Sequence, residues 1–153
     1  MSNAILIIAH APLASALRHC VLHVYSGAGA SEVGSVLTAF DVPADQPMEE
    51  TLAAARRVMD LSSAKSTLVL TDLFGATPCN IAQKLVEGTT ARLVAGVNLP
   101  MLLRAVTYCR ETLDVLVART MAGGTQGVMQ VANVAPQNQA RKKNDQDDND
   151  HQQ

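Results

Sequence analysis

The sequence predicts an α/β fold, a doubly wound and mainly parallel sheet of four strands flanked by helices. Short apolar segments without polar alternation recur along the chain, as in strands that are buried on both faces. Segments with the helical spacing of apolar residues separate them, and this alternation is typical of a parallel sheet. A chain of 153 residues, 48% hydrophobic, has the size of one domain with a single core.

The first strand is expected over residues 4–9, where the chain reads Ala-Ile-Leu-Ile-Ile-Ala. His10 follows it directly. Pro12 then begins a helix that runs to about Tyr25, because proline suits the first turn of a helix. Two glycines soon after Tyr25 end this helix.

A second strand is predicted over residues 33–40, followed by a turn at 41–43. Asp45 is a candidate N-cap for the next helix, with Pro47 in its first turn. The residues expected to form the buried stripe of this helix are Met48, Leu52, Ala55 and Met59.

Two more strands are predicted over residues 66–71 and 91–97, with a helix over 77–86 between them. After Pro100 a single long helical pattern runs through Val117 and weakens at the next glycine pair. The glycines of that pair are Gly123 and Gly124.

The segment Gly127 to Val134 is predicted to be a short C-terminal edge strand. Residues 136–153 are almost free of apolar side chains and mix Arg, Lys, Asp, Asn and Gln, a composition typical of a disordered polar tail. The expected organisation is therefore one domain over residues 1–135 and a tail over 136–153.

Composition excludes several classes of function. A net charge of −2, no Trp and only two Phe and two Tyr argue against nucleic-acid binding, which uses basic patches and stacking rings. The apolar runs are far shorter than the roughly 18 residues of a membrane span. Three scattered cysteines and the lack of a basic segment before the first apolar run indicate a reducing, cytoplasmic location.

Two predicted strands end in residues that carry chemistry. His10 ends the first, and the third leads into Thr71-Asp72-Leu73-Phe74-Gly75-Ala76-Thr77-Pro78. The carboxyl ends of parallel strands share one edge of a sheet, where ligands bind at the point of reversed strand order. Taken alone, a histidine at a strand end is more often a half-buried structural residue, and the second segment would be a plain turn. The two motifs together favour a functional site.

We expect His10 to be a nucleophile that carries a phosphoryl group, because histidine titrates near neutral pH. Asp72 is expected to accept from one ring N–H, which leaves the other ring nitrogen free to attack. Thr77 and Pro78 are read as the N-cap and first residue of a helix, whose N–H groups suit a dianion. The predicted phosphate-binding residues are Phe74, Gly75, Ala76 and Thr77. No metal or cofactor is expected.

Together with a third segment, Gly96-Val97-Asn98-Leu99-Pro100-Met101, these motifs resemble the enzyme IIA component of the mannose family of the bacterial phosphoenolpyruvate:sugar phosphotransferase system. The similarity extends over about residues 5–134. Ile7-Ile8-Ala9-His10 matches the first motif, and residues 72–78 with Asn80 match the second.

The resemblance implies that His10 accepts phosphate on Nε2 from the phosphocarrier HPr and passes it to a IIB component for sugar uptake. It also implies that Asp72 holds Nδ1, that Thr77 contacts the phosphoryl group, and that homodimers form by exchange of a strand over 127–134. The IIB component would be a separate protein, and the chain would be recruited to a membrane permease complex without inserting into the membrane. Ala11-Pro12 departs from the glycine that follows the histidine in many members.

Other functions remain open from the sequence. A regulatory phosphoprotein, which binds partners according to its phosphorylation and feeds no transporter, fits the same residues, and an inert scaffold of the same fold is a third possibility. A histidine phosphatase would have an arginine directly before the histidine, where this chain has Ala9. The IIA-like subunit of dihydroxyacetone kinases usually reads Asp-Leu-Gly-Ser where this chain reads Asp-Leu-Phe-Gly.

Three local patterns suggest other sites but have simpler interpretations. His19 and His23 have metal-ligand spacing, yet they complete a polar helix face. Residues 29–35 have the glycine spacing of a phosphate-binding loop without its lysine. Cys79 is expected to be a packed small residue.

Overall fold

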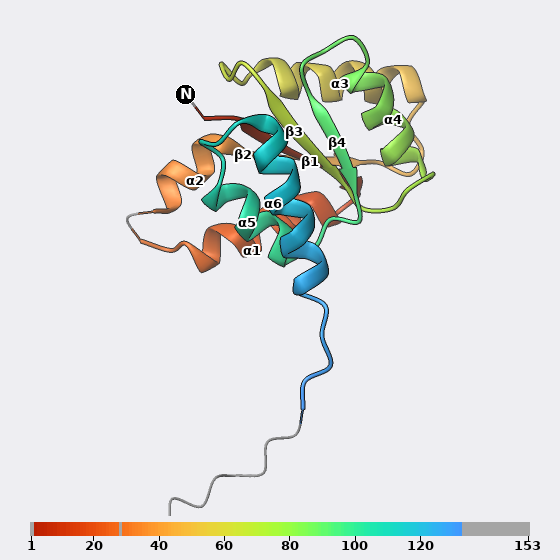
Figure 1. Cartoon of the computed structure of the whole chain (residues 1–153). Helices are drawn as coiled ribbons and strands as arrows, with labels where there is room; N and C mark the ends of the chain where they lie inside the picture. Colours follow the sequence, from red (N-terminus) through yellow and green to blue (C-terminus); the bar gives the residue numbers. More distant parts are fainter. Residues whose placement is uncertain (1, 28, 133–153) are drawn as a thin grey trace, which may run out of the picture.

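The computed structural model describes residues 2–27 and 29–132, which form three layers with a parallel sheet in the middle (Figure 1). The strands are β1 (Ala4–His10), β2 (Leu37–Val42), β3 (Thr67–Thr71) and β4 (Arg92–Ala95). The helices are α1 (Leu13–Val24), α2 (Ala30–Val36), α3 (Met48–Asp60), α4 (Thr77–Val86), α5 (Leu99–Thr107) and α6 (Leu113–Gln126). The predicted α/β class and four-stranded parallel sheet are therefore confirmed.

The strand order is β2-β1-β3-β4, and every neighbouring pair is parallel. From β1 the chain crosses to β2 on one side and then returns to β3 on the other side of β1. The order of strands thus reverses between β1 and β3. In open parallel sheets this reversal leaves a crevice outside the carboxyl ends of the two strands.

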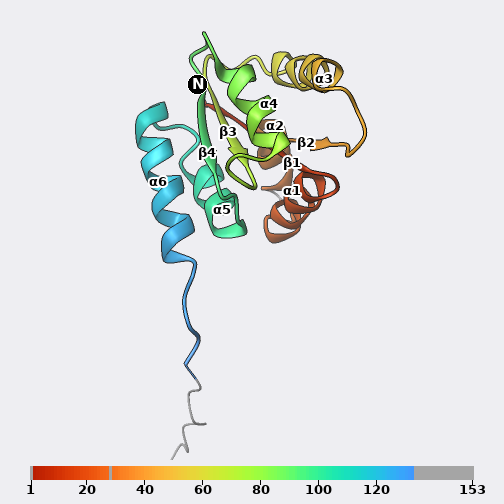
Figure 2. The ribbon, with the colours of Figure 1, turned by 90° about the vertical axis from the view of Figure 1, so that its right-hand side faces the viewer.

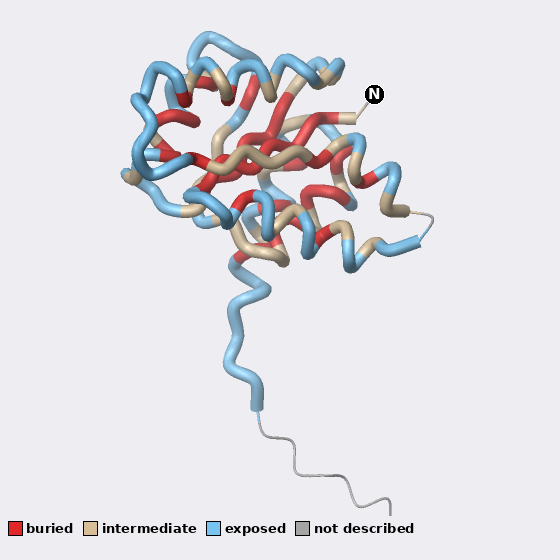
Figure 3. The backbone as a smooth tube through the Cα atoms, turned by 180° about the vertical axis from the view of Figure 1, so that it is seen from behind, coloured by how far each residue is buried: buried red, intermediate tan, exposed pale blue. Residues whose placement is uncertain are grey.

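Both faces of the sheet are covered, because β1 sends apolar side chains to each of them. Ile5, Ile7 and Ala9 pack toward α1, α2, α5 and α6, whereas Leu6 and Ile8 pack toward α3 and α4. Figure 2 shows the two helical layers on opposite sides of the strands. The two inner strands, β1 and β3, form the most continuous buried region, drawn red in Figure 3.

The second predicted strand is displaced. Residues 33–36 belong to α2, and the strand occupies Leu37–Val42. Val33 and Leu37 are the buried residues of this region, at the spacing of one helical turn rather than the alternation of a strand. Leu37 then pairs with Ile5 and starts the ladder.

Helix α3 begins at Met48, so Asp45 is not its N-cap. Pro47 takes the N-cap position, and its carbonyl accepts the N–H of Thr51. Three of the four residues predicted for the buried stripe, Leu52, Ala55 and Met59, do pack against the core, whereas Met48 is 37% exposed. Thr51 is buried on this face as well, and its polar side chain concealed it from the sequence pattern.

The long helical pattern after Pro100 is two helices, α5 and α6, which pack against each other. Gly123 and Gly124 lie inside α6 and do not end it. A Cβ at Gly123 would lie 2.3 Å from Cγ of Arg104, and one at Gly124 would lie 2.5 Å from Cγ of Met101. Glycine is therefore required here for close approach of the two helices.

The predicted C-terminal strand is not formed by this chain on its own. Residues 128–132 follow α6 without strand structure and are exposed, while 133–134 lie outside the described residues. A strand needs a hydrogen-bonding neighbour, and residues 128–132 pair with none of the described strands. The predicted tail over 136–153 also lies outside the described residues.

Asn3 stabilises the edge of the sheet at which the parallel strands begin. Its side-chain amide donates to the carbonyls of Cys109 at 2.7 Å and Glu111 at 2.8 Å, and its amide oxygen accepts from the Ser66 hydroxyl. Asn3 is only 5% exposed. These bonds join the start of β1 to the turn between α5 and α6.

We expect Asn3→Ala to lower the free energy of unfolding by about 2 kcal/mol, because the substitution removes three side-chain hydrogen bonds and leaves the Glu111 carbonyl and the Ser66 hydroxyl without this partner. Urea denaturation measures this change. Ser2→Ala is the control, since the Ser2 side chain makes no hydrogen bond to any described residue. Equal stability of the two variants would contradict the fastening role of Asn3.

Candidate functional site

His10 is the last residue of β1 and lies at the carboxyl edge of the sheet. Its neighbours within β1 are buried, but its side chain is 54% exposed. Asp72 follows the last residue of β3, the strand beside β1, and its side chain is 12% exposed. The two residues thus flank the point where the strand order reverses.

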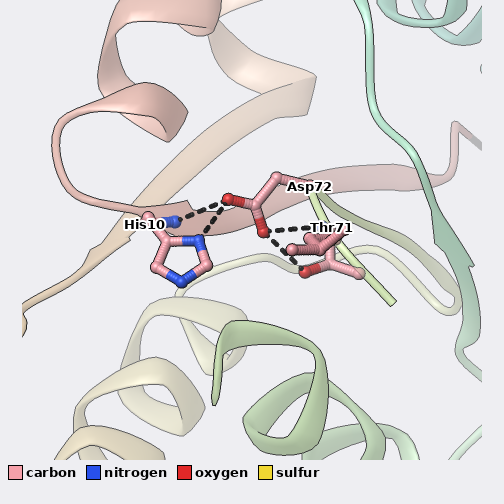
Figure 4. A network of polar contacts seen from close by, with 4 residues as sticks. His10, Thr71 and Asp72 are labelled. Atoms are coloured by element: carbon pink, nitrogen blue, oxygen red, sulfur yellow. Dashed lines mark hydrogen bonds and ion pairs between the residues drawn. The ribbon is translucent and has the colours of Figure 1, made fainter. Parts of the chain in front are cut away.

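The His10 and Asp72 side chains are in contact (Figure 4). Nδ1 of His10 lies 2.6 Å from Oδ2 of Asp72, and the same oxygen accepts the backbone N–H of His10 at 3.0 Å. The other carboxylate oxygen, Oδ1, accepts the N–H of Leu73 at 2.9 Å. The carboxylate is therefore fixed by its own turn while it holds both the ring and the backbone of His10.

These contacts determine the charge of Asp72. Partial burial raises the pKa of the Asp72 carboxyl, but the hydrogen bonds from the His10 ring, the His10 backbone and the Leu73 backbone outweigh it and bring the pKa below its ordinary value. An ionised carboxylate can only accept hydrogen bonds. A neutral His10 ring consequently carries its proton on Nδ1, and Nε2 keeps a free lone pair.

The ring presents Nε2 away from Asp72, as Figure 4 shows. Imidazole with a free lone pair at an exposed position is a nucleophile, and a carboxylate on the opposite nitrogen stabilises the cation formed when Nε2 is substituted. The pair is chemically suited to take up an electrophilic group on Nε2 and to release it again.

The predicted phosphate-binding residues form the turn that leads from Asp72 to α4. Gly75 has a φ of +82°, a conformation that other residues rarely adopt. Phe74 is 76% exposed, so its side chain stands on the surface. No hydrogen bond joins Phe74, Gly75, Ala76 or Thr77 to His10 among the described residues.

The start of α4 differs by one residue from the expected one. Ala76 is the N-cap, Thr77 is the first helical residue, and no side chain of the described residues caps the helix. Pro78, next in the first turn, has no N–H to satisfy. Cys79 is buried at 2% exposure and packs as a small core residue.

The segment from Gly96 to Met101 has a structural part in this edge of the sheet. The N–H groups of Gly96 and Val97 both donate to the carbonyl of Thr71, which ends the β4 ladder earlier than predicted. Asn98 caps α5, since its side-chain oxygen accepts the N–H of Met101 at 2.9 Å. These contacts fix the end of β3 immediately before Asp72.

Asp41 and Ser15 form a second polar contact near His10 that the sequence did not indicate. Oδ1 of Asp41 accepts the N–H of Ser15 at 3.0 Å, and the Ser15 hydroxyl donates to Oδ2. The two residues are 26 apart in sequence, so only the displaced register of β2 brings them together. An acidic residue at a strand end was the available signal, and it was read as part of a turn.

His19 and His23 are both exposed on α1. In residues 2–27 and 29–132, no three His, Cys, Asp or Glu side chains gather in a way that would hold a metal ion. Nor does any helix in that part of the chain have the length and apolar character needed to cross a bilayer.

Comparisons with known proteins give a family for most of the chain. Residues 4–121 match the family described as "PTS system fructose IIA component", EIIA-man. No curated protein matches the chain.

Several solved structures are similar in fold. The EIIA component of the phosphotransferase system from Streptococcus agalactiae is 23% identical, with a TM-score of 0.71 over 84% of this chain and 96% of that chain. The mannose/sorbose-specific IIA subunit from Enterococcus faecalis is 24% identical, with a TM-score of 0.74 over 88% and 98%. The IIA protein associated with the fucose utilization operon of Streptococcus pneumoniae is 17% identical, with a TM-score of 0.71 over 85% and 93%.

Proposed function

The chain belongs to the mannose-type IIA family of the phosphotransferase system, which gives it a phosphoryl-carrier role, and we propose that His10 is the residue that carries the group. The observation that supports His10 is the 2.6 Å contact between its Nδ1 and Asp72, which leaves Nε2 free at an exposed position. The proposed donor is phospho-HPr and the proposed acceptor is a IIB component, both in the cytoplasm.

In the proposed reaction, the lone pair on Nε2 of His10 attacks the phosphorus atom held by the donor. The bond from phosphorus to the donor breaks, and its electron pair stays with the donor. The ring keeps its Nδ1 proton and becomes positively charged, which the Asp72 carboxylate stabilises across the 2.6 Å contact. Attack on the same phosphorus by the acceptor reverses these changes and regenerates neutral His10.

The start of α4 is the proposed cradle for the phosphoryl oxygens. It follows directly from the Asp72 turn, carries the exposed hydroxyl of Thr77, and has no capping side chain among the described residues. Backbone N–H groups at the start of a helix favour anions. We assign Gly75, Ala76 and Thr77 to this cradle, and the exposed ring of Phe74 to the rim where a partner protein would approach.

Labelling tests this function. The protein is incubated with phosphoenolpyruvate, enzyme I and HPr, and the phosphate that it takes up is assayed for acid lability, as expected of phosphohistidine. Adding a IIB component should then discharge the label. Failure of the complete mixture to label the protein, when it labels a known IIA component in parallel, would overturn the proposal.

We also propose a homodimer in which the segment from residue 127 onward pairs with a second copy. Val128, Met129 and Val131 are exposed apolar residues of this segment, at 78%, 70% and 84%. The outer side of β4 has no neighbouring strand in the described chain, so it offers an edge for pairing.

Sedimentation equilibrium should therefore give twice the monomer mass of 16.2 kDa. Val131→Lys should weaken the dimer, because it places a charge in an apolar contact. Val24→Lys is a suitable control, since Val24 is exposed on α1, far from this segment in sequence. A monomer at micromolar concentration would contradict the exchange.

A further inference from the structure

The loop between β1 and α1 is held from two strands. On the β3 side, Asp72 accepts the N–H of His10. On the β2 side, the carbonyl of Val42 accepts the N–H of Ala11 at 3.1 Å, and Asp41 holds Ser15 through both its backbone N–H and its hydroxyl. The segment from His10 to Ser15 is therefore held by two carboxylates, Asp72 just after β3 at its start and Asp41 of β2 at its end.

Asp41 replaces a cap that α1 lacks. The N-cap of α1 is Pro12, which makes no side-chain hydrogen bond to the helix, and the first turn contains no acidic residue. A helix start leaves backbone N–H groups without partners, and Asp or Asn is a preferred acceptor for them. Asp41 supplies this acceptor from β2, where it lies opposite Ala9 in the parallel register.

The position of Asp41 links this cap to the reactive ring. Ala9 and His10 pair with Asp41 and Val42, so the same two residues of β2 fix both the end of β1 and the start of α1. Pro12 has no N–H with which to anchor the loop. Without Asp41, one described hydrogen bond would still join this loop to β2, the one that the Ala11 N–H donates to the Val42 carbonyl.

We propose that Asp41 is a positioning residue for phosphoryl transfer: by capping α1 from β2 through Ser15, it holds the loop that sets the His10 ring against Asp72. This inference rests on the proposed function of His10. Asp41 acts through the backbone of the loop and does not touch the transferred group.

The test compares Asp41→Ala with Asp41→Asn in steady-state transfer of phosphate from phospho-HPr, through this protein, to a IIB component held in excess. Asparagine keeps an oxygen for the Ser15 N–H and offers an amide donor to the Ser15 hydroxyl, so it preserves the cap. We expect Asp41→Ala to lower kcat about tenfold with KM for phospho-HPr unchanged, because a small misplacement of a reacting group slows the chemical step. Asp41→Asn should restore kcat. Ser15→Ala, which removes only the hydroxyl bond, should lie between them and serves if Asp41→Ala does not fold.

Asn3→Ala is the control for a general loss of stability, because it weakens the opposite, amino edge of the sheet. All assays are made well below each variant's melting temperature. The Nδ1 proton of His10, observed by NMR in the unphosphorylated protein, is a second readout: its hydrogen-bonded signal should weaken or shift in Asp41→Ala and stay in place in Asn3→Ala.

Four results would overturn the inference: a wild-type kcat in Asp41→Ala, an effect on KM alone, equal slowing in Asn3→Ala, or an Asp41→Asn variant as slow as Asp41→Ala. If the wild-type protein takes up no phosphate, the proposed function fails instead. The NMR comparison then still decides whether Asp41 positions the His10 ring.

Discussion

His10→Ala is expected to reduce phosphate uptake from phospho-HPr to the background of a mixture without this protein. The substitution removes the nitrogen on which the new bond to phosphorus would form, so no partial activity should remain. Uptake of radiolabelled phosphate, followed by separation of the proteins, measures this. The fold should survive, since the His10 side chain is about half exposed and, among the described residues, makes its one side-chain hydrogen bond to Asp72.

Two other histidines supply matched controls. His19 and His23 are exposed on α1, and neither makes a hydrogen bond with its side chain among the described contacts. His19→Ala and His23→Ala should both be labelled like the wild type. Label that persists in His10→Ala and disappears in one of these variants would place the reaction on another residue.

Asp72→Asn is expected to slow phosphoryl transfer by up to about 10⁴-fold, the loss that the same substitution causes where it leaves a catalytic histidine in the wrong tautomer. In the wild type, three N–H groups point at the carboxylate: the ring Nδ1–H, the His10 backbone and the Leu73 backbone. An amide has one acceptor oxygen and one donor nitrogen. Whichever way the substituted amide turns, its NH₂ group faces an N–H that needs an acceptor.

The orientation that serves Leu73 places the amide NH₂ against His10. The ring then accepts on Nδ1 and carries its proton on Nε2, where it blocks attack on phosphorus. Single-turnover kinetics with phospho-HPr should show this loss in the chemical step. A rate within threefold of the wild type, as in a silent substitution, would remove Asp72 from the reaction. Asp45→Asn, which removes a charge from an exposed loop residue, is the control.

The difference in stability between the wild type and Asp72→Asn should depend on pH. The pKa of Asp72 is lowered in the folded protein, so its ionised form stabilises the fold above the ordinary aspartate pKa of about 3.9. This contribution is lost as the pH falls through the lowered, folded-state pKa. The melting temperature of the wild type should therefore exceed that of Asp72→Asn near neutral pH, and the difference should shrink on acidification below about pH 4. A difference in melting temperature that does not change with pH would show that the charge of Asp72 is not the source of the difference.

Local sequence patterns predicted most of the elements well. The helix over 77–86 has its predicted limits, and β1 and β3 are within one residue of them. These segments have strong signals. The two strands are uninterrupted apolar runs, and the helix has a proline in its first turn shortly after a glycine. Where the signal was mixed, the prediction was wrong, as at residues 33–36, where Val33 and Leu37 are buried one helical turn apart.

The glycines of α6 show a second limit. A glycine pair in a helical pattern is usually read as a weak point, but Gly123 and Gly124 are required by Arg104 and Met101 on the facing helix. Whether a glycine breaks a helix or lets another helix approach is decided by tertiary packing, which one sequence does not display.

Part of the candidate site could likewise be predicted from the sequence. That His10 and Asp72 lie together follows from two strand ends on one edge of a parallel sheet, and the structure shows the contact. The helix cap predicted at Thr77 lies at Ala76, since capping depends on backbone angles. Asp41 was missed because its contact with Ser15 depends on the register of β2 against β1. The chemical roles of these residues stay predictions.

The direction of the parallel strands decides where a tag should be attached. β1 runs from Ala4 toward His10, so the amino-terminal end of the described chain emerges at the far side of the sheet from the reactive ring. Helix α6, by contrast, brings Gly124 and Val128 beside Gly96, at the carboxyl end of β4. A fusion or surface anchor joined before β1 would leave the face of His10 open, whereas one joined after α6 would emerge on that face and compete with incoming proteins.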